Sequence, residues 1–276
     1  MVYTSPVTGI RTCLPMTKTD HGANPSFQPT SPRDALERND DMTQPSDADF
    51  IGDGAWAQLP IPGYPNTWLR NPSLPLIRRP LTRTERTGPD RLAVKLRPGH
   101  SNLAVDPNGR AALGQLIRVS GRIMDEAGKP LAGAIVELWQ ANAAGRYRNP
   151  LDTRDAPLDP NFLGNGRTAT DAGGRYEFFT IKPGAYPVPN SGRWWRPPHI
   201  HFSVFGPSSI SRLVTQMYFP GDPLNAHDRL IASIRDQGAR ERLVSRQTDT
   251  GDIDGEFLAF EHDLVLAGSA ATPGLA

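Results

Sequence analysis

Short segments of alternating apolar and β-branched residues, divided by turn sequences, run through the second half of the chain. The segments are Gln115–Met124, Ala134–Trp139, Arg175–Ile181, His199–Phe205 and Arg212–Phe219. This alternation is typical of strands that bury one face, and many short strands separated by turns favour an antiparallel β-sandwich. We therefore expect a mainly β fold.

The segments between and after these strands add detail to the prediction. Asp125–Pro130 (DEAGKP) is a turn sequence, so the first two segments are predicted to form a hairpin. Arg229–Leu243 carries Leu and Ile at helical spacings and predicts one short helix. Glu256–Leu266 alternates again and predicts a closing strand.

The first part of the chain is rich in proline and polar residues. Residues 1–50 have no sustained apolar period and are predicted to be a flexible N-terminal arm. Residues 51–112 mix prolines with aromatic residues such as Trp56 and Tyr64, which predicts a long irregular segment packed on the core or on a partner subunit. Residues 113–276 are expected to form the β-sandwich domain.

Charge and cysteine content exclude several classes of partner and site. The chain has 30 Lys and Arg against 29 Asp and Glu, so a broad affinity for nucleic acid or a membrane surface is not expected. Its one cysteine, Cys13, excludes an intramolecular disulfide framework and a thiolate-rich metal site. No apolar run approaches the ~20 residues that span a bilayer, and no leader sequence is recognised, so a cytoplasmic location is expected.

The stretch WWRPPHIHF contains the most suggestive polar pattern. His199 and His201 alternate with apolar residues on a predicted strand, so both imidazoles lie on one face. That arrangement can present two nitrogen ligands to one metal ion. A structural or surface histidine pair fits the same pattern, so a metal site needs further ligands.

Two tyrosines in loops at strand ends are candidates for those ligands. Tyr147 lies in ANAAGRYR, just after the predicted strand AIVELW, and Tyr186 lies in KPGAYP. A packing role fits either tyrosine by itself. The case for a metal site rests on their combination with the histidine pair.

The wider sequence around these residues resembles the intradiol ring-cleavage dioxygenases, a family of non-haem iron(III) enzymes. The matching motifs are VELWQANAAGRYR, APLDPNF, GNGRTATDAGGRYEFFTIKPGAYP, WRPPHIHFSVFG and RLVTQMYFPGDP. They cover most of residues 113–230 in the family's order, and the likeness is greatest to the β chains of the protocatechuate-cleaving branch. The resemblance implies a prealbumin-like sandwich and a catalytic role for residues 113–276.

The resemblance also implies the metal and its ligands. Iron(III) is expected on Tyr147, Tyr186, His199 and His201. A phenol titrates near pH 10 in water, but a bound trivalent cation removes its proton at neutral pH. Two phenolates favour iron(III) over the iron(II) of two-histidine, one-carboxylate sites, and iron(III) acts as a Lewis acid on the substrate. A catechol displaces Tyr186 and is opened between its two hydroxylated carbons by dioxygen.

Residues around the implied iron receive roles from the same resemblance. Arg196 corresponds to an arginine that stabilises negative charge on the substrate ring, and Gln216 to a glutamine lining the pocket. Tyr64 and Arg70 match a segment at the pocket mouth that holds a substrate carboxylate. Leu230 lies where a branched aliphatic residue touches the ring. Val188 replaces an expected tryptophan, which leaves the substrate open.

Other interpretations remain beside protocatechuate cleavage. A catechol or hydroxyquinol dioxygenase is one, although the helical N-terminal segment of those relatives has no counterpart in this proline-rich sequence. A non-catalytic prealbumin-like binding module is another, since VSGRIMDEAGKPLAGAIVELW resembles such modules, and an iron-free subunit is a third. The protocatechuate type implies an α-like partner chain, with a catecholic aromatic acid and O2 as substrates.

Overall fold

The computed structural model describes residues 96–189, 191–206, 212–250, 256–267 and 270–275. The predicted arm over residues 1–50, and most of the predicted segment over residues 51–112, lie outside these ranges. The division of the chain into three parts therefore stays a prediction.

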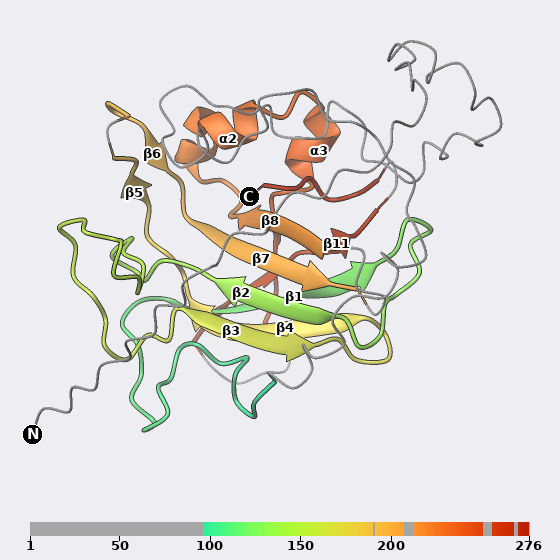
Figure 1. Ribbon diagram of the computed structural model, residues 1–276, viewed down its shortest axis with the longest axis horizontal. Coiled ribbons are helices and arrows are strands. Elements are labelled where there is room, and N and C mark those ends of the chain that lie inside the picture. Colours follow the sequence, from blue (N-terminus) through green and yellow to red (C-terminus); the bar gives the residue numbers. More distant parts are fainter. Residues whose placement is uncertain (1–95, 190, 207–211, 251–255, 268–269, 276) are drawn as a thin grey trace, which may run out of the picture. The chain divides into compact units, whose positions relative to one another are not determined.

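Two larger sheets and one small sheet make up the described fold (Figure 1). The first sheet contains β1 (Leu116–Met124), β4 (Arg175–Ile181), β9 (Arg246–Thr248), β10 (Leu258–Glu261) and β11 (Leu264–Val265). The second has the order β3 (Asn165–Ala169), β2 (Ile135–Trp139), β7 (His199–Phe205) and β8 (Arg212–Tyr218). The small sheet pairs β5 (Tyr186–Pro187) with β6 (Trp195–Arg196).

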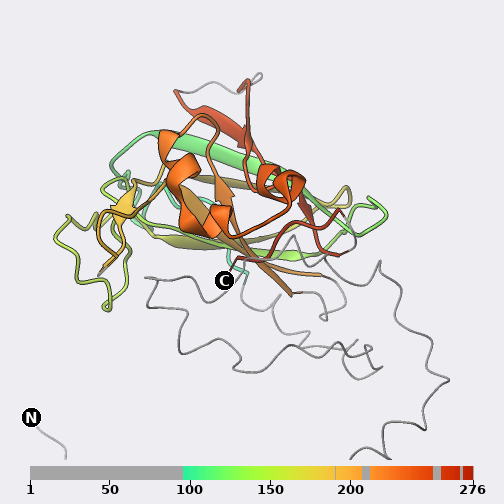
Figure 2. The same ribbon diagram turned by 90° about the horizontal axis from the view of Figure 1, so that it is seen from above.

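The main core lies between the two larger sheets, which form separate layers (Figure 2). Alternate residues of each strand point into it, as the period of a strand requires. The inward residues include Ile117, Val119 and Phe178 from the first sheet and Val136, Leu138, Ile200 and Phe202 from the second. The prediction of a mainly β fold with antiparallel sheets is confirmed, and the pairings of β10 and β11 with β1 are the parallel exceptions among the paired strands of the described residues.

The predicted hairpin of the first two segments is wrong. The turn forms as expected, with the amide of Asp125 donating to Lys129 O at 3.0 Å and Met124 bridging to Pro130. The chain then enters the other sheet: β1 pairs with β4, β10 and β11, whereas β2 pairs with β3 and β7. Each strand has one apolar face, and placing the strands in opposite layers lets both faces meet in the core.

The predicted helix over Arg229–Leu243 is two short helices, α2 (Arg229–Ala232) and α3 (Gln237–Glu241). A 3-10 helix, η5 (Pro223–His227), comes directly before α2. Asp228 and Asp236 cap the two α-helices, since their carboxylates accept hydrogen bonds from backbone amides of the first turn. Because Asp236 caps a new helix, the segment forms two helices where one was predicted.

The predicted closing strand is formed by β10 and β11, and both run parallel to β1. Ile117 pairs with Leu258 and Ile123 with Leu264. Gly121 lies between the two pairings, where an added Cβ would come within 2.0 Å of His262 O. Only a residue without a side chain lets the last strands pass this close to β1.

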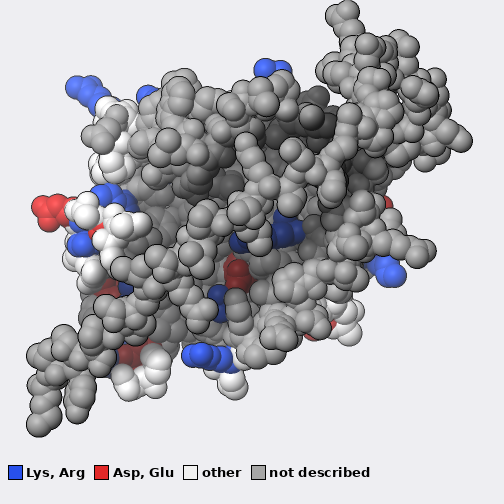
Figure 3. Space-filling view, in the orientation of Figure 1, with Lys and Arg blue, Asp and Glu red and all other residues white. Residues whose placement is uncertain are grey.

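No helix in the described ranges is long and apolar enough to cross a membrane. On the described parts of the face in Figure 3, Lys and Arg lie among Asp and Glu. This mixing agrees with the nearly balanced charge of the sequence.

Candidate metal centre

The four predicted metal ligands converge on one point at the end of the second sheet. Tyr147 Oη lies 3.0 Å from His201 Nε2 and 3.4 Å from His199 Nε2, and Tyr186 Oη lies 3.3 Å from His199 Nε2. The rings of Tyr147 and Tyr186 meet edge to face, with centroids 5.7 Å apart. Two phenol oxygens and two imidazole nitrogens therefore share one small space.

Both histidines are held by β7 and its neighbours. His199 Nδ1 lies 2.7 Å from the carbonyl oxygen of Pro197, so the proton sits on Nδ1 and the lone pair of Nε2 faces the site. The ring of His201 stacks on Trp139 of β2, with centroids 4.8 Å apart and planes 9° from parallel. The hydrogen bond fixes which nitrogen His199 presents, and the stacking fixes the plane of the His201 ring.

Two glycines bring the tyrosine loops together. At Gly145, an added Cβ would lie 2.3 Å from Ala185 O, the carbonyl just before Tyr186. At Gly184, an added Cβ would lie 2.4 Å from Ala143 O. The amide of Gly184 donates to Asn142 O at 2.9 Å. Backbone packs directly on backbone here, so the spacing of the two phenols depends on residues that have no side chain.

The carboxylate of Asp152 and the guanidinium of Arg154 contact the two tyrosines. Asp152 accepts a hydrogen bond from the amide of Tyr147 at 2.8 Å and forms an ion pair with Arg154. The guanidinium of Arg154 lies over the ring of Tyr186, 4.1 Å from its centroid. The pair therefore links the loop of one tyrosine to the ring of the other.

The environment keeps both imidazoles neutral. Burial, followed by the charges of Arg196 and His201, holds the pKa of His199 well below its usual value. Burial of the ring and the charge of Arg196 lower the pKa of His201 to about 3, even though His201 as a whole is partly exposed. A neutral imidazole has the free lone pair that a metal requires.

The donor set suits a hard, highly charged metal ion. Among the described residues, no group of three or more His, Cys, Asp and Glu could hold a metal. Here two phenol oxygens lie beside the two imidazole nitrogens. Phenol oxygens become strong anionic ligands once a cation removes their protons. The residues present therefore fit iron(III) in chemistry and in spacing.

Arg196 lies at the centre of a buried polar network beside the histidines. The residue is 1% exposed, and its Nε donates to Asp228 Oδ2 at 2.8 Å. Its Nη2 donates to Gln216 and to Tyr218 Oη, and Tyr218 Oη donates to Gln216 Oε1 at 2.9 Å. Gln216 and Tyr218 lie opposite His201 and His199 in the pairing of β8 with β7.

Sequence reasoning missed Tyr218 and Asp228. Tyr218 lies two residues after Gln216 on the same strand, so alternation alone places both on one face. Asp228 precedes a short helix and has the side chain typical of an N-cap. Its contact with Arg196 joins residues 32 positions apart, which no local pattern reveals.

The predicted substrate contacts divide into two groups. Val188 is 5% exposed and Leu230 is 1% exposed, and both belong to a second apolar cluster with Trp194 and Tyr218. Val188 is therefore packed among large side chains. Tyr64 and Arg70 lie outside the described residues.

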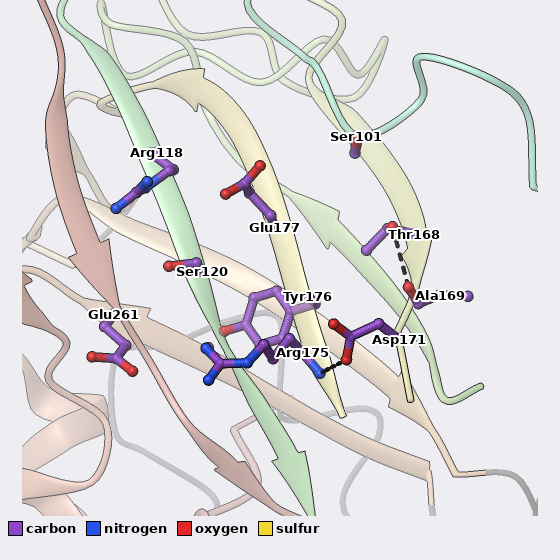
Figure 4. A pocket seen from close by; sticks show the side chains of 11 residues that line it. Ser101, Arg118, Ser120, Thr168, Ala169, Asp171, Arg175, Tyr176, Glu177 and Glu261 are labelled. Atoms are coloured by element: carbon purple, nitrogen blue, oxygen red, sulfur yellow. Dashed lines mark hydrogen bonds between the residues drawn. The ribbon is translucent and has the colours of Figure 1, made fainter. Parts of the chain in front are cut away.

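A separate hollow of about 560 Å³ is lined by residues of the first sheet and by Thr168 and Ala169 of β3 (Figure 4). Its lining includes Arg118 and Ser120 of β1, Glu177 of β4 and Glu261 of β10. Glu261 forms an ion pair with Arg246, and the amide of Arg175 donates to Asp171 at 2.8 Å. The charges around the hollow are mixed in sign, and none of the predicted site residues lines it.

The comparisons of sequence point to one family. The Dioxygenase_C family model, described as Dioxygenase, matches residues 87–268. The chain is 50% identical over 214 residues to the protocatechuate 3,4-dioxygenase beta chain of Burkholderia cepacia, a match that covers 77% of this chain and 90% of that one. It is 32% identical over 184 residues to hydroxyquinol 1,2-dioxygenase of a Rhizobium species, covering 62% and 59%. A solved catechol 1,2-dioxygenase from an Acinetobacter species has 29% identity and a TM-score of 0.46, covering 60% of this chain and 56% of that one.

Proposed function

Because this chain belongs to the family of intradiol ring-cleavage dioxygenases, we propose that it holds iron(III) and cleaves protocatechuate to 3-carboxy-cis,cis-muconate with O2. The iron ligands in this proposal are Tyr147, Tyr186, His199 and His201. Both oxygen atoms enter the product, so no external reductant is required.

The convergence of four donor atoms carries the proposal. Atoms about 2.1 Å from a shared metal ion, with angles of about 90 to 109° between them, lie roughly 3.0 to 3.4 Å apart. The measured separations of Tyr147 Oη from His201 Nε2 and from His199 Nε2 are 3.0 and 3.4 Å, and that of Tyr186 Oη from His199 Nε2 is 3.3 Å. Hydrogen bonding to Pro197 and stacking on Trp139 orient the imidazoles in advance, which supports a preformed site.

When bound, iron(III) supplies Lewis acidity that lowers the pKa of the catechol hydroxyls and prepares the ring for reaction with O2. Tyr186 would be the ligand that gives way to the substrate. It lies on the two-residue strand β5 and is partly exposed, whereas His199 is buried within β7. Its Oη would take one of the two catechol hydroxyl protons as it leaves, and a hydroxide would take the other, so the substrate would bind as a dianion.

Arg196 stabilises negative charge on the substrate ring. Its guanidinium stays charged at every physiological pH and is held rigidly by buried partners. Preorganised charge of this kind acts most strongly where water is excluded. Gln216 is hydrogen-bonded to both Arg196 and Tyr218, so its role is to orient the guanidinium and to line the pocket.

Protocatechuate is favoured over catechol and hydroxyquinol by the comparisons of sequence. The beta chain from Burkholderia cepacia matches at 50% identity over 90% of its length, against 32% over 59% for the hydroxyquinol enzyme. In this proposal Leu230 and Val188 line the ring site. Tyr64 and Arg70 hold the substrate carboxylate at the pocket mouth.

The same relative is named as a beta chain, which supports an α-like partner for this chain. We expect the full assembly to be a hetero-oligomer. Coexpression with an α-like chain should raise oxygen uptake above that of the single chain, and full activity of the single chain would contradict the expectation. The cytoplasmic location expected from the sequence stays a prediction.

Colour and oxygen uptake test the function together. Tyrosinate bound to iron(III) absorbs visible light by charge transfer, so iron-loaded protein should be burgundy to brown and should consume O2 with protocatechuate faster than with catechol or hydroxyquinol. A colourless, inactive protein after loading with iron would favour a non-catalytic module. A coloured protein that prefers catechol would support the proposed ring cleavage but contradict protocatechuate as the substrate.

A further inference from the structure

The carboxylate of Asp228 joins two parts of the proposed substrate site. Asp228 has no exposed surface and lies between η5 and α2. Its Oδ2 accepts a hydrogen bond from Arg196 Nε at 2.8 Å. Its Oδ1 accepts one from the amide of Leu230 at 2.6 Å. One side chain therefore contacts the residue proposed to stabilise charge and the backbone of a residue proposed to touch the ring.

The pairing with Asp228 fixes the direction of the Arg196 guanidinium. The carboxylate holds Nε on one side of the planar group, while Gln216 and Tyr218 hold Nη2. Arg196 and Asp228 are 1% and 0% exposed, so neither charge is screened by water. Removing the carboxylate would take a charged partner from the buried guanidinium and loosen its hold at Nε, while Nη2 keeps its hydrogen bonds to Gln216 and Tyr218.

We propose that Asp228 is a positioning residue for ring cleavage, which holds Arg196 in the orientation that stabilises the charged substrate. The role rests on the proposed function. Asp228 acts through Arg196 and does not itself touch the reacting atoms. Its second oxygen caps α2 and keeps Leu230 at the ring site. One carboxylate therefore sets both the direction of the Arg196 charge and the position of Leu230.

The first test replaces Asp228 with asparagine, which has nearly the same shape. Asparagine offers one acceptor oxygen to the two donors and carries no negative charge. We expect iron content and the charge-transfer band of Asp228→Asn to match those of the wild type. We expect kcat for protocatechuate to fall on the order of 10- to 100-fold, since misplacement of a catalytic group by about 1 Å costs that much.

A double-mutant cycle separates positioning from a general structural effect. If Asp228 acts through Arg196, adding Asp228→Asn to Arg196→Met should lower kcat by less than about twofold beyond Arg196→Met alone. Independent losses that multiply in the double variant would overturn the proposal. The proposal would also be overturned if the wild-type protein is active and Asp228→Asn has the same kcat.

Asp236 supplies a matched control, because it caps α3 in the same way through the amide of Ala239 at 2.8 Å. Asp236→Asn should leave kcat unchanged. Asp228→Ser keeps an oxygen able to cap α2 and removes the acceptor for Arg196, so it should repeat the loss of kcat. If neither Asp228 variant folds while Asp236→Asn does, Asp228 is a structural residue and the proposal is wrong.

The outcomes distinguish this inference from the function on which it rests. Wild-type protein that takes up neither iron nor oxygen would overturn the proposed function, and the role of Asp228 with it. Active, coloured wild-type protein with an equally active Asp228→Asn variant would overturn the role of Asp228 alone.

Discussion

Tyr186 and Arg196 lie directly opposite each other in the antiparallel pair of β5 and β6. The tyrosine proposed to leave the metal and the arginine proposed to stabilise the substrate are therefore neighbours on one small sheet. Arg196 is held by the buried network on its other side, whereas Tyr186 is partly exposed. We therefore expect Tyr186 to move more readily than Arg196.

Replacing Tyr147 with phenylalanine should remove iron and colour together. The change deletes one of four converging donor atoms and keeps the ring. Iron affinity should fall by more than about 100-fold, because losing even a hydrogen-bond partner of a ligand costs about 10- to 100-fold. Metal analysis and the visible spectrum measure the effect. Tyr176→Phe is the control: Tyr176 donates to His262 O in the core, so this variant should keep its iron.

Gly184→Ala should loosen the metal site through the backbone. The added methyl would meet Ala143 O at 2.4 Å and push the two tyrosine loops apart. We expect iron affinity to fall at least about 10-fold, with the core strands intact by circular dichroism. Gly173→Ala is a matched control, since its methyl would meet its nearest neighbour at an ordinary 3.4 Å. Equal iron binding in both variants would show that the two tyrosine loops can move apart at Gly184 without loss of the metal site.

Val188→Trp tests how much space surrounds the ring site. Val188 is 5% exposed in a cluster with Trp194 and Leu230, so a larger side chain should overpack it. The free energy of unfolding should fall by about 1 to 3 kcal/mol. Urea unfolding measures this change, and Val188→Leu should give a smaller one. Unchanged stability would mean that open space adjoins Val188 and that the pocket is roomier than the packing indicates.

Stability should fall in acid partly because of His262. Burial lowers the pKa of His262 to about 3, so below pH 6.5 the unfolded chain binds a proton that the folded chain does not. The loss begins near pH 6.5, grows to about 2 kcal/mol at pH 5, and stops growing near pH 3. His262→Phe should flatten this part of the profile in iron-free protein, as measured by urea unfolding between pH 5 and 7.5. An identical profile in both proteins would assign the acid sensitivity to other groups.

Alternation along the chain predicted the strands well and their partners poorly. Arg175–Ile181 and His199–Phe205 are strands with the predicted bounds. The pattern of apolar residues indicates which face of a strand is buried. Because both sheets bury one face against the same core, this pattern cannot assign β1 and β2 to different layers.

The candidate site was predictable as far as local signals reach. His199 and His201 share a face because a strand has a period of two. The two tyrosines were candidates from their place in loops at strand ends, and the resemblance to a family assigned them as ligands. The placement of Asp228 beside Arg196 depends on how η5 and α2 fold back onto β6, which is a tertiary arrangement. The break between α2 and α3 did have a local signal, the capping residue Asp236.

The parallel pairing of β1 with β10 and β11 also bears on how the chain folds. The two parallel partners of β1 begin only at Leu258, so the edge of β1 opposite β4 stays open until that late segment has been synthesised. Contacts between such distant segments form slowly, and an open strand edge invites pairing with other molecules. A chain that ends before Leu258 should therefore aggregate once the ribosome has released it, even though it contains every proposed iron ligand.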